Sequence, residues 1–214
     1  MDEKNQKQDG VLVPESPKGA DERPDVRRRL RRDIAVFGNA RALCFAAMLA
    51  AMSLILGKFL QIPNPVQQII RISFENLPVL LSGLTMGPLV GAMTGAVADL
   101  LGCVLYGYDI NPLVTLGAAA VGLVSGFIGN YVLRRPLTLR VVVSVIAAHL
   151  VGSVLIKSLG LAAWYLSFHQ MGLVELLLWR LLTYTIIAAA ECVILCLLLR
   201  HRALAGLIER MRKK

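Results

Sequence analysis

Four charged side chains lie inside otherwise apolar stretches of the sequence, and their chemistry raises the first question about function. Asp99, Lys157, Arg180 and Arg71 come from four different stretches. Because a charge inside a membrane-length apolar segment is costly to bury, it indicates a functional site by default. At about 1.5 Å of helix rise per residue, all four lie in the half of the segments that we predict to face outside. Two interpretations stay open: an outward-facing pocket for an anionic ligand, or an ion pair of Asp99 with Arg71 or Arg180 that only holds helices in register.

The stretches that carry these residues are long enough to cross a membrane. Hydrophobic residues make up 56% of the 214 residues, and the mean hydropathy is +0.64. Most stretches lack the polar stripe that a helix of a soluble protein would show. The sequence therefore predicts an all-α, multi-pass protein of the cell membrane, an integral bundle of six transmembrane helices. The predicted spans are residues 40–60, 69–87, 88–106, 112–133, 141–164 and 173–199.

The basic residues predict how the bundle is oriented. Residues 1–36 are expected to form a disordered, charged cytoplasmic tail, residues 37–202 the six-helix transmembrane domain, and residues 203–214 a basic cytoplasmic tail. Both tails and the predicted loop 134–140 are rich in Lys and Arg. With six spans these three segments fall on one side, and the positive-inside rule makes that side the cytoplasm. The net charge of +9 therefore reports orientation in a lipid bilayer, and we expect no nucleic-acid partner.

Small residues recur with helical spacing in the middle of the chain. Glycine occupies every fourth position from Gly83 to Gly95, and Pro88 divides this series. Because small residues let membrane helices approach closely, we expect two facing small surfaces at a tight hairpin on the cytoplasmic side. Gly122 and Gly126 repeat the pattern in the fourth predicted span. Tight bundle packing is sufficient to explain this series.

Motifs for catalysis or energy coupling are absent from the sequence. There is no G-x-x-x-x-G-K-[ST] phosphate loop, no H-E-x-x-H and no G-x-S-x-G, and the four cysteines fit neither a zinc site nor a disulfide framework. We therefore expect no enzyme activity, cofactor or metal, and a binding subunit that depends on other proteins for energy. A membrane enzyme is the alternative, but it needs Asp99 to meet His149 or Glu191, which helix depth places in the opposite half.

At this point the sequence resembles a known family. The stretch RISFENLPVLLSGLTMGPLVGAMTGAVADLLG (Arg71–Gly102) is similar to the signature region of the folate-family substrate-binding (S) subunits of energy-coupling factor (ECF) transporters. The resemblance continues through residues 111–135, where aromatic residues of the family pattern are replaced, and through Trp164, Arg180 and Glu191 near the end of the chain.

This resemblance implies a function and a set of partners. Such subunits bind a vitamin from outside and deliver it with a transmembrane coupling protein and two cytoplasmic ATPases. The family docks on the coupling protein through an A-x-x-x-A motif in its first helix, which Ala47 and Ala51 match here. Ala42, Ala46 and Ala50 form a second, parallel row. Packing of this helix within the subunit is the alternative explanation for any one of these alanines.

The resemblance also implies roles for individual residues if the ligand is a folate. A carboxylate or amide would read the edge of the pterin ring, aromatic side chains would stack on the ring, and cations would bind the carboxylates of the glutamate tail. The residues placed in these roles are, in that order, Asp99 and Asn111; Tyr106, Tyr108, Trp164 and Tyr165; and Arg71, Lys157 and Arg180. Another vitamin or a modified base is the alternative ligand, and a purely structural membrane protein is the alternative of a different class.

Overall fold

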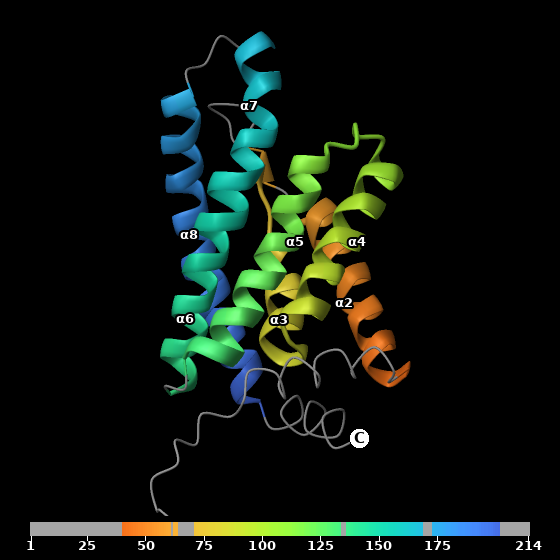
Figure 1. Cartoon of the computed structure of the whole chain (residues 1–214), viewed down its shortest axis with the longest axis vertical. Helices are drawn as coiled ribbons and strands as arrows, with labels where there is room; N and C mark the ends of the chain where they lie inside the picture. The colour runs from red at the N-terminus through yellow and green to blue at the C-terminus, as the bar shows by residue number, and fades with distance from the viewer. Residues whose placement is uncertain (1–39, 61, 64–70, 134–135, 169–172, 202–214) are drawn as a thin grey trace, which may run out of the picture.

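The computed structural model describes residues 40–60, 62–63, 71–133, 136–168 and 173–201, which form a bundle of helices (Figure 1). A two-residue antiparallel pair, β1 (Ile62–Pro63) with β2 (Arg71–Ile72), lies between the first two helices. The helices, including two π-helical segments η2 and η3, are α2 (Ala40–Phe59), α3 (Asn76–Met86), α4 (Pro88–Tyr106), α5 (Pro112–Phe127), η2 (Ile128–Val132), α6 (Leu137–Ala148), η3 (His149–Ile156), α7 (Lys157–Phe168) and α8 (Leu173–Arg200).

Five segments of this bundle are long and apolar enough to cross a membrane. They are Ala40–Phe59, Pro88–Tyr106, Pro112–Val132, Leu137–Ala162 and Leu177–Arg200. The predicted all-α membrane bundle is therefore confirmed, and these five spans agree with five of the six predicted ones. The second predicted span differs, because its helix α3 has 11 residues, and a helix needs about 20 to cross the hydrocarbon core.

The short length of α3 follows from Pro78. Proline has no N–H to bond the carbonyl four residues earlier, so it is tolerated only in the first turn of a helix. The helix accordingly begins at Asn76, two residues before Pro78. Upstream of it, Arg71–Ile72 is extended and pairs with Ile62–Pro63. We expected a helix over residues 69–87, but within the described part of that stretch, residues 71–87, the helix is confined to Asn76–Met86.

The segments α6, η3 and α7 follow one another without a gap and make one long rod (Figure 1). This rod begins at Leu137, whereas the sequence placed Arg140 in a basic loop. Arg140 instead lies in the first turn of α6, where it donates a hydrogen bond to the carbonyl of Leu84 at 3.1 Å and another to Asn130 at 2.8 Å. Arg140 is partly buried because its side chain reaches inward to a carbonyl group at the end of α3, which has no partner within its own helix.

The glycine series forms the predicted hairpin. Gly87 separates α3 from α4 with a φ of 109°, a conformation that favours glycine. The two helices then pack against α5 almost backbone to backbone. A Cβ on Gly91 would lie 2.5 Å from the carbonyl oxygen of Gly122, and one on Gly126 would lie 2.6 Å from the Cα of Pro88. A Cβ on Gly91 would also lie 2.7 Å from the Cα of Gly83, so the two small surfaces of the hairpin face each other, as the spacing predicted. The close packing of the third span against the fourth is an additional finding.

The start of α2, the start of α6 and the end of α8 lie at one end of the bundle (Figure 1). Arg200 of α8 donates a hydrogen bond to Thr138 of α6 at 3.2 Å, which joins two of these three segments. The α3–α4 hairpin lies at the same end, and an apolar core packs around it that includes Leu80, Val141 and Leu195.

Candidate functional site

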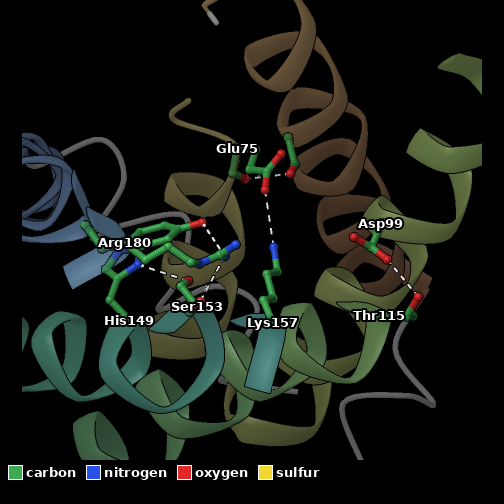
Figure 2. A network of polar contacts seen from close by, with 9 residues as sticks. Glu75, Asp99, Thr115, His149, Ser153, Lys157 and Arg180 are labelled. Carbon is green, nitrogen blue, oxygen red and sulfur yellow. Dashed lines mark hydrogen bonds and ion pairs between the residues drawn. The ribbon is translucent and has the colours of Figure 1, made fainter. Parts of the chain in front are cut away.

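An ion pair between Lys157 and Glu75 lies at the centre of the polar side chains. The ammonium nitrogen of Lys157 is 3.2 Å from Oε1 of Glu75. Lys157 is buried, with 5% of its surface exposed, whereas 40% of the Glu75 side chain is exposed. Figure 2 shows Lys157 extended from its helix toward Glu75.

Neighbouring elements fix the backbone of both partners. Glu75 immediately precedes α3, and its carbonyl accepts a hydrogen bond from Oγ of Ser53 on α2 at 2.6 Å. Lys157 is the first residue of α7, directly after η3. Its side chain passes over Gly117 of α5, where an added Cβ would lie 2.5 Å from Cγ of Lys157. A larger residue at position 117 would therefore displace the lysine.

Asp99 lies on the other side of Lys157 from Arg180 in the view of Figure 2. Its Oδ2 accepts a hydrogen bond of 2.7 Å from the hydroxyl of Thr115 on α5. That hydroxyl also contacts the carbonyl of Asn111 at 3.3 Å. The acid is half-buried within α4. Among the described side chains Thr115 is its hydrogen-bond partner, and a carboxylate can accept further hydrogen bonds from a ligand.

These groups surround a cavity of about 100 Å³. Its wall comes from α2, the start of α3, α4, α5 and the start of α7, and it extends to Tyr108 in the turn after α4. Its described lining carries two acids and one cation, which differs from a simple anion site. The polar and aromatic residues that line it are Ser53, Glu75, Asn76, Asp99, Tyr106, Tyr108 and Lys157.

Arg180 does not line this cavity. Its guanidinium donates a hydrogen bond to the carbonyl of Ser153 in η3 at 3.0 Å, and it lies 5.4 Å from the centre of the Tyr184 ring. It is buried, with 6% exposed. Within the described part of the chain no carboxylate pairs with it. The expected alternative of an Asp99–Arg180 pair is therefore wrong, since Asp99 bonds to Thr115 and Arg180 bonds to η3.

The remaining predicted ligand residues divide into three cases. Tyr106 lines the cavity, and its hydroxyl donates to the carbonyl of Leu54 at 2.7 Å. Asn111 does not line it: its side chain caps α5 by accepting from the N–H of Leu113, and it donates to Gly160 at 2.7 Å. For Arg71 and Trp164 the structure places the backbone in β2 and α7, but their side chains lie outside the described residues, as does that of Tyr165.

Sequence reasoning missed Glu75 as a site residue. It lies within the second predicted span, residues 69–87. The signal in the sequence is that Glu75 lies three residues before Pro78. Because proline is tolerated in the first turn of a helix, Pro78 predicts a helix that starts close to Glu75. A carboxylate at a helix start inside a membrane segment is the same kind of costly charge as Asp99.

His149 and Glu191 form a second buried pair. Nε2 of His149 lies 2.5 Å from Oε2 of Glu191, and Nδ1 lies 3.2 Å from Oγ of Ser153. The pair joins η3 to α8, and it does not meet Asp99 in the cavity. Their geometry is that of an interhelical contact, and it does not supply the meeting with Asp99 that the membrane-enzyme alternative needs.

A second, larger cavity of about 370 Å³ lies between α6–η3 and α8. Its wall is mostly apolar, and its rim includes Ile146, 54% exposed, and Leu181, 45% exposed. In a membrane this rim would face lipid. The smaller cavity is the better candidate for a polar ligand, because the acids and the buried ammonium face it. Among the described residues no group of His, Cys, Asp and Glu is arranged to hold a metal ion.

The alanines of α2 separate into two rows. Ala47 and Ala51 are exposed, whereas Ala42, Ala46 and Ala50 are buried against the rest of the bundle. The second row therefore packs within the molecule. The first row leaves a small-residue surface open on the outside of α2.

The comparison with family models decides the class of protein. Residues 41–200 match the model of the ECF transporter substrate-specific component. The chain belongs to this family. It is therefore a multi-pass membrane protein and a component of a transporter rather than an enzyme.

Two further similarities are consistent with membership of the ECF substrate-specific component family. The chain is 34% identical over 68 residues to the folate transporter FolT of Clostridium novyi (strain NT). That match covers 32% of this chain and 38% of the relative, so it spans well under half of the relative's length. A crystal structure of FolT bound with folic acid superimposes with a TM-score of 0.58 and 20% identity, covering 73% of this chain and 91% of that one. This second similarity shows a shared fold.

Proposed function

We propose that this substrate-specific component binds folate or a reduced folate from outside and delivers it with an ATP-driven coupling module. The observation that carries the proposal is the cavity in which Asp99, Lys157 and Tyr106 meet. The resemblance of one segment to a folate transporter supports the choice of ligand. The coupling protein and two ATPases follow from the family, since the sequence has no phosphate loop of its own.

The chemistry of the cavity suits a pterin-type ring. The ring edge offers N–H and amino donors, and Asp99 is an acceptor held by Thr115. A carboxylate that receives such donors contributes charge-assisted hydrogen bonds, which are about twice as strong as neutral ones. Tyr106 and Tyr108, whose rings meet edge to face, provide an aromatic surface beside it. The glutamate tail of folate would then extend toward a cation.

We place Lys157 closest to the ligand among the three predicted cations and keep Arg180 in a supporting position. Lys157 lines the cavity, whereas Arg180 contacts Ser153 in the preceding segment η3. Arg180 therefore acts on the ligand through the position of η3 or by its charge. Asn111 is assigned to capping of α5 rather than to ligand contact.

A binding assay on the purified full chain tests this function. Labelled folate, 5-formyltetrahydrofolate and a panel of other vitamins are offered to the protein in detergent or nanodiscs. We expect saturable binding of one or both folates, with an affinity at least about tenfold above that for the rest of the panel, a difference of about 1.4 kcal/mol. Tight binding of a different vitamin would support the alternative ligand. A folded protein that binds none of them would leave the buried charges with a structural role and remove the proposal.

A further inference from the structure

The Glu75–Lys157 pair joins a fixed cation to an acid that is free to move. Lys157 is held by its burial and by the close contact of its Cγ with Gly117. Glu75 is anchored through its backbone, whose carbonyl accepts from Ser53, while its side chain makes no capping hydrogen bond to α3 and is 40% exposed. Rotation of the Glu75 side chain would therefore bring the carboxylate into water without moving the helix.

The charge of the cavity has a consequence for an anionic ligand. Among the described residues that line the cavity, Glu75 and Asp99 are the acids and Lys157 is the cation. The ammonium of Lys157 already has a carboxylate at 3.2 Å. A further carboxylate would meet two acids of like charge. Leaving a buried ammonium without a partner is strongly unfavourable as well. A ligand carboxylate therefore binds Lys157 most favourably by taking the place of the Glu75 carboxylate, since the repulsion between the two like charges is then removed.

The size of the cavity agrees with such an exchange. Its volume of about 100 Å³ is below the roughly 300–1,000 Å³ that ligand pockets usually have. The Glu75 side chain lies in its wall, so its departure enlarges the cavity at the point where the ligand charge must enter. One movement thus supplies both the space and the free cation.

We propose that Glu75 is a specificity-determining residue: an internal counter-ion that occupies Lys157 until a ligand carboxylate displaces it. This inference rests on the proposed function, because it needs a ligand that carries a carboxylate. The free energy needed to break the Glu75–Lys157 ion pair is subtracted from the binding free energy of every anionic ligand that takes its place. A ligand with the same ring and no carboxylate leaves the pair intact and gains nothing from Lys157.

The test compares two ligands on variants of the full chain. Folate carries tail carboxylates, and 6-hydroxymethylpterin keeps the ring without them. In Glu75→Gln we expect the affinity for folate relative to that for the pterin to rise about tenfold over the wild type, because the internal competitor for Lys157 is gone. Asp109→Asn, which removes an exposed acid from the turn after α4, is the matched control and should leave the ratio unchanged.

A second variant covers the case in which Glu75→Gln fails to fold with its buried lysine unpaired. Glu75→Gln combined with Lys157→Gln removes both charges, and here the ratio should fall below the wild-type value. An unchanged ratio in either folded variant overturns the inference while leaving the proposed function in place. If the wild-type protein binds neither ligand, the proposed function itself fails.

Discussion

Single residues decide whether this chain holds a charge in the right place within the membrane. Lys157 depends on Gly117 for the room that its stem occupies, and on Glu75 for a partner. Arg180 depends on a backbone carbonyl and on the face of Tyr184. The two predicted cations whose side chains the structure describes, Lys157 and Arg180, therefore meet the cost of burial in different ways and are not equivalent.

The dependence of Lys157 on Gly117 gives a prediction at this scale. In Gly117→Ala the new Cβ would lie 2.5 Å from Cγ of Lys157 and 2.8 Å from the carbonyl oxygen of Gly152. Because one of these atoms belongs to the backbone, α5 and η3 must separate, which costs about 1–3 kcal/mol of stability. We expect folate binding to weaken about tenfold as the ammonium moves, measured by isothermal titration calorimetry beside thermal unfolding.

The control for that variant is Leu116→Ala, which changes the adjacent, 57% exposed side chain on the same helix. Its folate affinity should equal that of the wild type. If Gly117→Ala lowers the unfolding temperature but keeps the wild-type affinity, Lys157 is not a ligand residue.

Sequence patterns predicted the positions of these residues better than their partners. Depth along a helix placed Asp99, Lys157 and Arg180 in one half of the bundle, because rise per residue is regular. The Lys157–Glu75 pair was missed because it depends on how each helix is rotated about its axis. It also depends on where α3 begins, and Pro78 is the signal for that helix start. Asn111 was misleading for a different reason: an amide before a helix-starting proline serves equally as a cap.

At the scale of elements, helix patterns predicted both ends of four spans within one residue and failed where polar contacts override hydropathy. The span 88–106 was predicted as found. The fifth span begins at Leu137 rather than 141, because Arg140 reaches the carbonyl of Leu84 and so belongs in the helix. The π-helical turns of η3 leave no simple signal in the sequence, and π-helices often occur at functional sites.

The exposed alanine row of α2 gives the prediction for this scale. A smooth surface lets a helix of the coupling protein approach closely, and a larger side chain would keep the two helices apart. We expect Ala47→Leu to bind folate within about twofold of the wild type, because Ala47 lies outside the cavity, and to lose uptake in cells that express the whole transporter.

Ala189→Leu is the matched control, since Ala189 is an exposed alanine on α8. Its uptake should remain at the wild-type level. Normal uptake by Ala47→Leu would show that the docking surface lies elsewhere, and equal losses in both variants would point to a general defect in insertion.

At the scale of the whole molecule, the bundle has an apolar core around the α3–α4 hairpin and a polar cavity that extends toward Tyr108. The orientation of the bundle in the membrane decides from which side a ligand can enter this cavity. Arg41, Arg140 and Arg200 lie toward the end where the α3–α4 hairpin is packed backbone to backbone. The cavity extends toward the opposite end, to Tyr108. The positive-inside rule predicts that the basic end lies in the cytoplasm. A ligand would then enter from outside, as uptake requires.

Cysteine labelling tests this orientation. In a background without the four native cysteines, Asp109→Cys and His201→Cys each introduce one exposed thiol, in the turn after α4 and just beyond α8. A membrane-impermeant maleimide should label Asp109→Cys in intact cells and His201→Cys only after the membrane is permeabilised. The reverse labelling pattern would show that the cavity opens to the cytoplasm. In that orientation Asp99 and Lys157 would meet a ligand on the side to which uptake must deliver it, and the proposed direction of transport would be wrong even if folate binds.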